Sequence, residues 1–307
     1  MNEGFNRVAI LGLGLIGSSI CHAIKAYGGA KDVVGHARSA ETRKVASELG
    51  LVSKVFENPA DAVKGADLVI LCAPVGACGD ITRAISASLE PGAIVTDVGS
   101  VKGAIIRDCA PHIPAGVHFI PGHPIAGTEQ SGPRAGFAEL FRNRWCILTP
   151  LPGADDAMVT RLEDFWLRFG SKVDRMSADH HDLVLAMTSH LPHLIAYNSV
   201  ATAADLEEVT QSEVIKFSAG GFRDLTRIAA SDPTMWRDVF LNNKEAVLEM
   251  LGRFMEELSM LQRAIRWGDG ETLFNLFTRA REIRKGIIAA GQDTAAPDFG
   301  RNPNQKG

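Results

Sequence analysis

A histidine in a segment rich in glycine and proline has the clearest chemical use of any side chain in this sequence. His123 lies within residues 121–129, where glycines and prolines keep the local backbone open. An imidazole changes protonation near neutral pH and can therefore accept a proton from a bound substrate. From this residue alone, a catalytic base and a histidine that merely satisfies a turn both stay open.

Upstream of this histidine, a cluster of glycines matches the pattern of a dinucleotide-binding turn. The cluster follows the apolar run 8–11 and opens a segment whose apolar residues recur at helical spacing. At such a turn, backbone N–H groups and the helix dipole can bind a pyrophosphate, which favours dinucleotide binding over a tight turn without a ligand. The residues assigned to this cofactor site are Gly12, Gly14, Leu15, Ile16 and Gly17. A nucleotide beside a proton acceptor predicts a dehydrogenase.

The position that contacts the cofactor ribose is expected about 20 residues after the glycines, and it is usually acidic where NAD is bound. Residues 35–39 contain no carboxylate, whereas Arg38 and Ser39 can hold the 2′-phosphate of NADP. We therefore predict an NAD(P) site in which these two residues accommodate NADP. The alternative, a solvated Arg38 with no role in binding, leaves the preference between the two cofactors open.

The elements that must position these residues indicate an α/β fold in the first half of the chain. Short apolar runs alternate with segments long enough for crossover helices, which is the arrangement of a sheet with parallel strands. The runs lie at residues 8–11, 33–34, 68–72, 93–96, 117–120 and 146–148.

From about residue 178 onward, long helical periodicities replace the strand pattern and predict a helical second domain. Asp232 and Pro233 form the start signal of one long helix, with Asp as its N-cap and Pro at its first position. Its expected apolar stripe consists of residues 236, 240, 247, 251, 254, 258, 261 and 265. The last residues contain too little apolar surface to become ordered. The predicted domains and disordered tail span residues 1–177, 178–291 and 292–307.

Composition excludes several classes of protein. With 32 basic and 36 acidic residues, the net charge of −4 argues against a surface that binds nucleic acid or anionic lipid. No run reaches the roughly 20 apolar residues of a membrane helix, so we expect a soluble, cytoplasmic protein. The five cysteines lack the short paired spacings of a zinc site or a disulfide framework, and we expect them to be reduced core thiols.

Five motifs follow one another along the chain, at residues 12–17, 97–102, 122–129, 189–193 and 220–238. In this order they resemble the motifs of the prephenate/arogenate dehydrogenase family of tyrosine biosynthesis, up to about residue 290. The resemblance implies an α/β protein with an N-terminal Rossmann-type dinucleotide-binding domain and a C-terminal all-helical dimerisation domain. It therefore implies a homodimer whose interface includes the apolar stripe, although a bundle core within one chain stays open for that stripe.

The reaction that the resemblance implies removes a hydride from C4 of prephenate or arogenate, while the ring carboxylate leaves as CO2 and the ring becomes aromatic. The hydride passes to NAD(P), so only the proton of the 4-hydroxyl needs a base. By resemblance that base is neutral His123, and Ser100 orients the imidazole and reaches the same hydroxyl. Ser100 could also cap a helix that starts at Val101.

By the same resemblance, Arg227 binds a carboxylate of the dianionic substrate, because a guanidinium supplies a permanent bidentate charge. His193 corresponds to a histidine of the substrate pocket, and the assignment of His190 stays open. Further residues at the pocket or its entrance are Thr128, Glu129, Gly220, Asp224 and Trp236. Structural roles stay open for these, since Trp236 belongs to the apolar stripe and Asp224 could cap a helix or pair with Arg227.

We expect no metal site. His180, His181 and Asp182 are adjacent, but neighbouring histidines on a helix point about 100° apart and make a poor pair of ligands. Two other functions fit the predicted fold. One is a hydroxy-acid dehydrogenase of the 3-hydroxyisobutyrate or 6-phosphogluconate type, which depends on a lysine of its helical domain. The other is a nucleotide-sensing regulator without catalysis. Neither needs the histidine, serine and arginine described above together.

Overall fold

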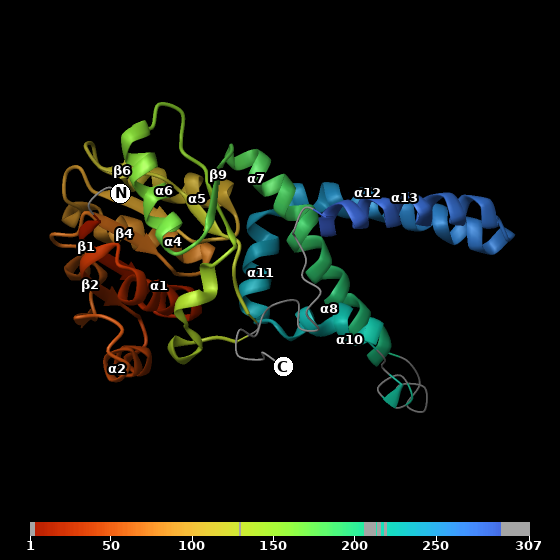
Figure 1. Cartoon of the computed structure of the whole chain (residues 1–307), viewed down its shortest axis with the longest axis horizontal. Helices are drawn as coiled ribbons and strands as arrows, with labels where there is room; N and C mark the ends of the chain where they lie inside the picture. Colours follow the sequence, from red (N-terminus) through yellow and green to blue (C-terminus); the bar gives the residue numbers. More distant parts are fainter. Residues whose placement is uncertain (1–3, 129, 206–212, 214–215, 218–219, 290–307) are drawn as a thin grey trace. The chain divides into compact units, whose positions relative to one another are not determined.

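The computed structural model describes residues 4–289 apart from residue 129 and the segments 206–212, 214–215 and 218–219 (Figure 1). Glu129 and the predicted tail, 292–307, therefore lie outside the described residues. The chain forms two compact units, of which the first ends at Leu248 and the second begins at Glu249. All the site residues described below belong to the first unit.

Six parallel strands form the main sheet of the first unit, in the order β3-β2-β1-β4-β5-β6 (Figure 1). They are β1 (Phe5–Leu11), β2 (Ala30–His36), β3 (Lys54–Phe56), β4 (Leu68–Leu71), β5 (Ile94–Asp97) and β6 (His118–Phe119). The central strand β4 is buried along its whole length, as expected for a sheet that helices cover on both faces. The predicted α/β class is confirmed, and the strand order is that of a dinucleotide-binding domain.

Helices pack on both faces of this sheet and bury two separate apolar clusters. One cluster joins α1 and α6 to the sheet and includes Ile20, Phe165 and Trp166. The other involves α4 and α5 and includes Cys78 and Ile105. The α-helices of this part are α1 (Leu15–Tyr27), α2 (Ala40–Glu48), α3 (Pro59–Ala62), α4 (Val75–Ile85), α5 (Lys102–Cys109) and α6 (Asp156–Arg168). The short 3-10 helices are η1 (Ser86–Ser88), η2 (Ala110–His112), η3 (Pro133–Ala135) and η4 (Ala138–Phe141).

A second, smaller sheet carries His123. In the order β7-β8-β9, strand β7 (Gly122–Pro124) is antiparallel to β8 (Trp145–Leu148), and β8 is parallel to β9 (Lys172–Arg175). The prediction that residues 146–148 belong to the parallel sheet was therefore wrong. Pro121 interrupts the ladder after β6 because proline has no N–H to donate, and the chain then begins the new sheet.

After β9 the described segments are helical, which agrees with the predicted change of pattern near residue 178. The elements are α7 (Ala178–Leu185), the π-helical η5 (Ala186–His190), α8 (Leu191–Ala204), α10 (Gly220–Thr226), the 3-10 helix η6 (Arg227–Ala230), α11 (Pro233–Asn242), α12 (Lys244–Trp267) and α13 (Gly270–Ala289). The π-helical turn ends two residues before Pro192, whose ring cannot follow a regular α-helical turn without disturbing it.

The long helix predicted from Asp232 is in fact two helices. Its start is as predicted, because the Asp232 side chain accepts a hydrogen bond from Met235 N at 2.9 Å and Pro233 occupies the first turn. Asn243, with φ −109° and ψ 33°, then separates α11 from α12. The Asn243 side-chain amide instead forms hydrogen bonds to α7 and η5.

The break also divides the predicted apolar stripe. Trp236 and Val247 are buried within the first unit, and Phe240 packs against the same apolar cluster as Trp236. In the second unit, by contrast, Leu258 and Ile265 are 47% and 68% exposed. The first part of the stripe therefore belongs to the core of one chain, and only the later part includes exposed apolar surface.

The cysteines are free thiols, and four of the five are buried, as expected. Burial raises the pKa of Cys21 to about 12 and that of Cys109 to about 11, so both stay protonated at neutral pH. Among the described helices, none combines the length and the apolar character needed to cross a bilayer.

Candidate active site

The glycine turn between β1 and α1 depends on close backbone packing at two of its glycines. Gly12 has a positive φ of 115°, and a Cβ there would lie 2.4 Å from Cys72 O. A Cβ at Gly17 would lie only 2.0 Å from Gly12 O. Any side chain at either position would therefore push α1 or the neighbouring strand away from the turn.

Gly14 differs from these two glycines because its Cβ position has no atom of the described residues within 4 Å. It precedes α1, which begins at Leu15 with no acidic residue in its first turn and no side-chain cap. The N–H groups of Leu15, Ile16 and Gly17 belong to the first turn of the helix, where the positive end of its dipole lies. Open space beside uncapped N–H groups fits the pyrophosphate of a dinucleotide.

Arg38 and Ser39 follow the end of β2, where a nucleotide-binding fold places the cofactor ribose. Both residues are exposed, and the Ser39 hydroxyl caps α2 by accepting a hydrogen bond from Thr42 N. The Arg43 guanidinium donates to the carbonyls of Ala37 and Arg38 at 3.0 and 2.8 Å. This loop is thus supported by a second arginine, while the Arg38 side chain stays exposed.

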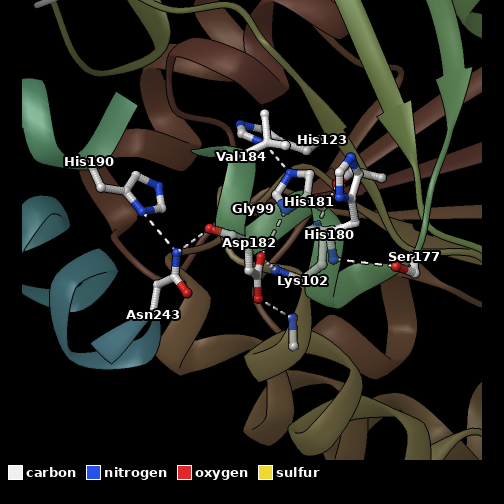
Figure 2. Close-up of polar contacts among 12 residues, drawn as sticks. Gly99, Lys102, His123, Ser177, His180, His181, Asp182, Val184, His190 and Asn243 are labelled. Atoms are coloured by element: carbon white, nitrogen blue, oxygen red, sulfur yellow. Dashed lines mark hydrogen bonds and ion pairs between the residues drawn. The ribbon is translucent and has the colours of Figure 1, made fainter. Parts of the chain in front are cut away.

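His123 is buried on a strand rather than placed in a turn, and another histidine contacts its ring (Figure 2). His123 Nδ1 lies 2.8 Å from Nε2 of His181 on α7, and the ring centroids are 5.1 Å apart. His181 is fully buried, and its Nδ1 lies 2.8 Å from Oδ1 of Asp182. These three side chains, Asp182, His181 and His123, form one hydrogen-bonded series that we name the Asp-His-His array.

Asp182 also connects α7 to the start of α5. Its carboxylate accepts hydrogen bonds from the backbone N–H groups of Lys102 at 2.7 Å and Gly103 at 2.8 Å. The residue in the N-cap position of α5 is Val101, which has no capping side chain, so the alternative in which Ser100 caps this helix was wrong. A carboxylate 80 residues away in sequence satisfies the helix terminus instead. Glycine at position 103 permits this approach, because a Cβ there would lie 3.0 Å from Asp182 Oδ2.

Burial keeps both histidines of the array neutral. It lowers the pKa of His123 well below the usual value, and repulsion from His181 and His190 in their protonated forms and from the Lys102 ammonium lowers it further. Burial also lowers the pKa of His181, against the opposing effect of its hydrogen bond to Asp182. For Asp182 burial raises the pKa, but hydrogen bonds from His181 and two backbone amides outweigh burial and lower the pKa overall. At neutral pH the array therefore holds one carboxylate and two neutral imidazoles.

A buried ion pair attaches the array to the edge of the main sheet. Lys102 is fully buried, and its ammonium group contacts the carboxylate of Asp97 and donates to Gly122 O at 2.6 Å. Asp97, the last residue of β5, also accepts a hydrogen bond from Gly122 N at 3.1 Å. The glycine turn follows the carboxyl end of β1, and His123 lies near the carboxyl end of β5. Since β1 and β5 are parallel strands of one sheet, both lie on the same side of it, beyond the carboxyl ends of its strands. The fold thus brings the candidate base and the candidate cofactor site to one edge.

A third buried histidine lies beside the array (Figure 2). Asn243 Nδ2 donates to the backbone carbonyl of Asp182 at 2.9 Å and also lies 3.0 Å from His190 Nδ1. Because an amide nitrogen only donates, His190 Nδ1 is an acceptor and Nε2 carries the proton. Nε2 of His190 is buried, and in the described part of the chain it has no hydrogen-bond partner. Burial lowers the pKa of His190 to about 4, which keeps this ring neutral as well.

His193, Trp236 and Arg227 form a second group of predicted site residues. The His193 and Trp236 rings are stacked, with centroids 3.6 Å apart and planes 23° apart. Burial lowers the pKa of His193 and the charge of half-buried Arg227 lowers it further, against the opposing effect of a hydrogen bond to Ser189 O. The His190 ring lies 6.0 Å from that of Trp236. Trp236 thus links the second group of predicted site residues to His190, which Asn243 connects to the Asp-His-His array.

The remaining predicted pocket residues are less enclosed. Thr128 is exposed, and its hydroxyl accepts a hydrogen bond from Gln130 N at 3.2 Å. Gly220 begins α10, and exposed Asp224 on the same helix has its carboxylate 3.5 Å from Arg223 Nε. Ser100 is half-buried, and the described contacts of the His123 ring come from His181 rather than from this serine.

Sequence reasoning considered His181 and Asp182 only as metal ligands and so missed the contact of His181 with the candidate base and that of Asp182 with His181. A signal was present in the helical spacing. Buried Leu185 follows His181 by four residues, and buried Ala186 follows Asp182 by four, which marks one buried face along α7 and the start of η5. For metal ions, the described residues contain no group of three or more histidine, cysteine or acidic side chains that could serve as ligands.

Two protein-family models match consecutive parts of this chain. The nucleotide-binding domain of prephenate dehydrogenase matches residues 20–175, and the dimerization domain of prephenate dehydrogenase matches residues 177–279. Together these matches cover well over half of the chain, and of the three functional hypotheses they support the prephenate/arogenate dehydrogenase.

Similar proteins cover almost the full length. A cyclohexadienyl dehydrogenase of Zymomonas mobilis is 41% identical over 92% of this chain and 96% of its own length. A prephenate dehydrogenase of Bacillus subtilis is 34% identical over 97% of this chain and 80% of its own length. The crystal structure of prephenate dehydrogenase from Aquifex aeolicus, in complex with hydroxyphenyl propionate and NAD+, has a TM-score of 0.86 at 32% identity, over 94% of this chain and 100% of that one.

Proposed function

The chain belongs to the prephenate dehydrogenase family, and on this premise we propose that it oxidatively decarboxylates prephenate, arogenate or both, in tyrosine biosynthesis, with NAD+ as hydride acceptor. The observation that carries the proposal is the buried, neutral imidazole of His123 at the sheet edge that also holds the glycine turn. A proton acceptor in that place can remove the proton of the substrate hydroxyl while a hydride leaves C4, the carbon that carries this hydroxyl.

The glycine turn is the proposed cofactor site. Gly14 leaves space for the pyrophosphate, and the first N–H groups of α1 bind it. When bound there, the nicotinamide ring would serve as the acceptor of the hydride from C4 of the substrate. We extend the proposal to NADP, whose 2′-phosphate would be contacted by exposed Arg38 and Ser39.

His123 is the proposed base. Its Nδ1 is engaged by His181, so Nε2 is the atom left to accept the proton of the substrate 4-hydroxyl. As the C4–H bond breaks, this proton moves to Nε2, and after CO2 has left, Nε2 returns it to the phenolate oxygen of the aromatic product. The proposed function of Ser100 is a hydrogen bond to the same hydroxyl, which orients the substrate against the imidazole.

Arg227, His193 and Trp236 are proposed to bind the substrate. The guanidinium would form paired hydrogen bonds with a substrate carboxylate, and the stacked His193 and Trp236 rings offer an apolar wall for the cyclohexadiene. The unpaired Nε2–H of His190 is a further donor for a substrate oxygen, because buried donors normally have a partner. Residues proposed for the rim of the pocket are Thr128, Glu129, Gly220 and Asp224.

We also propose that the enzyme is a cytoplasmic homodimer. Large apolar side chains are exposed on α12 and α13, which is unusual for a surface that faces only water. They include Met255, Leu258, Met260, Ile265, Trp267, Phe274, Phe277 and Ile283. A mass near that of one chain in sedimentation equilibrium at micromolar concentration would exclude this dimer.

Steady-state kinetics with both substrates and both cofactors test the proposed function. Reduced nicotinamide is followed at 340 nm for prephenate and arogenate, each with NAD+ and with NADP+. We expect saturable turnover with at least one substrate in the presence of NAD+. If NAD+ binds but neither substrate is turned over, the chain is a nucleotide-binding protein without this activity.

A further inference from the structure

We propose that His181 and Asp182 are positioning residues that fix His123 in its Nδ1–H tautomer, so that the Nε2 lone pair faces the substrate hydroxyl. The proposal rests on the proposed function in one respect, namely that His123 is the base. The two residues act through His123 and do not take part in the chemistry at the substrate.

The direction of the hydrogen bonds in the array follows from its carboxylate end. Asp182 accepts from the backbone N–H groups of Lys102 and Gly103 as well as from His181, at 2.7 to 2.8 Å. A carboxylate with this set of donors is ionised and can only accept, and the lowered pKa of Asp182 agrees with this state. His181 Nδ1 must therefore carry a proton and donate it to Asp182.

The tautomer of His181 determines which ring nitrogen of His123 carries the proton. His181 is neutral at pH 7, because burial lowers its pKa, and a neutral imidazole has one donor and one acceptor. With Nδ1 of His181 as donor, its Nε2 is the acceptor. The 2.8 Å contact to His123 Nδ1 then requires that His123 Nδ1 donates. The proton of neutral His123 is thus on Nδ1, and Nε2 is the free lone pair.

The surroundings of the array hold this arrangement in place. Asp182 is locked to the N-terminus of α5, and its backbone carbonyl accepts from Asn243. The other titratable groups near the two rings are Lys102 on α5, Asp97 on β5, His190 on η5 and Cys146 on β8. Lys102 and Asp97 are paired with each other, while burial raises the pKa of Cys146 and keeps that thiol protonated. None of these groups is hydrogen-bonded to His123 Nδ1, so His181 alone sets the tautomer among the described residues.

During turnover the array would also stabilise the charged base. When the substrate proton arrives on Nε2, His123 becomes an imidazolium whose Nδ1–H still donates to His181. The carboxylate of Asp182 lies one imidazole further away and offsets the new charge without taking the proton. In serine proteases an aspartate orients the catalytic histidine directly, also without becoming protonated, whereas here His181 lies between the two.

The test compares two substitutions of His181 with a matched control. His181→Phe keeps a planar ring but removes the acceptor for His123 Nδ1–H. His181→Gln keeps an acceptor oxygen near the position of Nε2 and loses the contact to Asp182. His180→Phe is the control, because His180 is the exposed neighbour on the same helix.

We expect His181→Phe to lower kcat at least about tenfold, within the roughly 10²–10⁴-fold that a general base contributes. KM for substrate and the Kd for NAD+ should change less than about twofold, because neither binding group is touched. His181→Gln should recover part of the lost kcat, and His180→Phe should match the wild type. A purely structural role would instead alter thermal stability and KM together, with no advantage of Gln over Phe.

Nitrogen-15 NMR of histidine-labelled enzyme, without substrate or cofactor, gives a readout that does not depend on activity. In the wild type at neutral pH, His123, assigned through the His123→Asn spectrum, should show a protonated Nδ1 and an unprotonated Nε2. A wild-type His123 with its proton on Nε2 overturns the proposal, as does His181→Phe with unchanged kcat. If His123→Asn itself retains full turnover, the assignment of the base is wrong, while the NMR tautomer still decides whether the array fixes the proton. The wild-type spectrum also decides the question if His181→Phe does not fold.

Discussion

The glycine turn of residues 12–17 is built within one short stretch of chain, whereas the Asp-His-His array combines side chains from β7 and α7 with the start of α5. In the turn, backbone N–H groups are the proposed binding groups, and distances of 2.0 to 2.4 Å leave no room for a Cβ at Gly12 or Gly17. In the array, side chains do the work and the backbone holds them in place. The two regions should therefore respond differently to substitution, and each prediction below is a test of that difference.

Removal of the base should have the largest effect and should leave the turn unaffected. His123→Asn is expected to lower kcat by roughly 10²–10⁴-fold, the usual contribution of a positioned general base. NAD+ affinity, measured by quenching of protein fluorescence, should stay unchanged because the glycine turn is intact. A loss of NAD+ binding equal to the loss of kcat would mean that the two regions are not independent.

The second-largest effect should follow removal of Arg227, the cation proposed to bind the substrate carboxylate. Arg227→Ala should raise KM for prephenate far more than KM for NAD+, because it removes a charge-assisted contact with the substrate carboxylate, which is worth on the order of 2–5 kcal/mol if the bound substrate excludes water from half-buried Arg227. Arg227→Lys should recover only part of the loss, since an ammonium group cannot form the paired hydrogen bonds of a guanidinium. Equal increases in both KM values would assign Arg227 to the stability of the fold.

Acid should destabilise the array and its neighbours through their histidines, whereas the glycine turn contains no titratable group. The folded-state pKa of His190 is about 4, below its usual 6.5, so the unfolded chain binds a proton that the folded chain rejects. The resulting stability is fully present above pH 6.5 and is lost as the pH falls to about 4. For His190 the loss is about 3 kcal/mol, and the lowered pKa values of His123 and His181 act in the same direction.

Urea unfolding at a series of pH values between 7 and 4 measures this effect. The His190→Gln variant should show a shallower fall in the free energy of unfolding than the wild type, because it lacks one titrating ring. Parallel curves for the two proteins would contradict the assigned shift.

Two substitutions in the turn should separate folding from binding. Gly17→Ala places a Cβ 2.0 Å from Gly12 O and should cost about 1–3 kcal/mol of stability, as overpacking usually does. Gly14→Ala meets open space and should change stability by less than about 0.5 kcal/mol, yet weaken NAD+ binding because the methyl group enters the pyrophosphate site. Thermal melts and NAD+ titration check the pair. Unchanged NAD+ affinity in Gly14→Ala would argue against a pyrophosphate at this position.

The smallest effect is expected at exposed Arg38, which is proposed to lie near the cofactor ribose. Arg38→Ala should weaken NADP+ more than NAD+, since only NADP+ carries the 2′-phosphate, and exposed ion pairs contribute about 0.2–1 kcal/mol. The ratio of kcat/KM for the two cofactors measures this. A ratio that does not change would assign Arg38 to the solvated surface.

The sequence by itself determined the features whose information is local. Apolar runs located most strands of the main sheet, the glycine spacing identified the turn between β1 and α1, and Asp232 with Pro233 marked the start of α11. Five motifs in order identified the family, which the matches over most of the chain confirm. Each of these signals consists of residues a few positions apart, so hydrophobic period, turn chemistry and capping could reveal it before folding.

Only the tertiary structure decided which side chains contact the candidate base. His123 and His181 are 58 residues apart, and Asn243 is 61 residues from Asp182, so neither contact leaves a periodic trace in the sequence. The same holds for the end of α11, where the side-chain amide of Asn243 bonds to buried groups of α7 and η5 that are far from it in sequence. Burial then makes these contacts decisive, since polar groups removed from water must find partners inside the fold, and the sequence does not specify which ones.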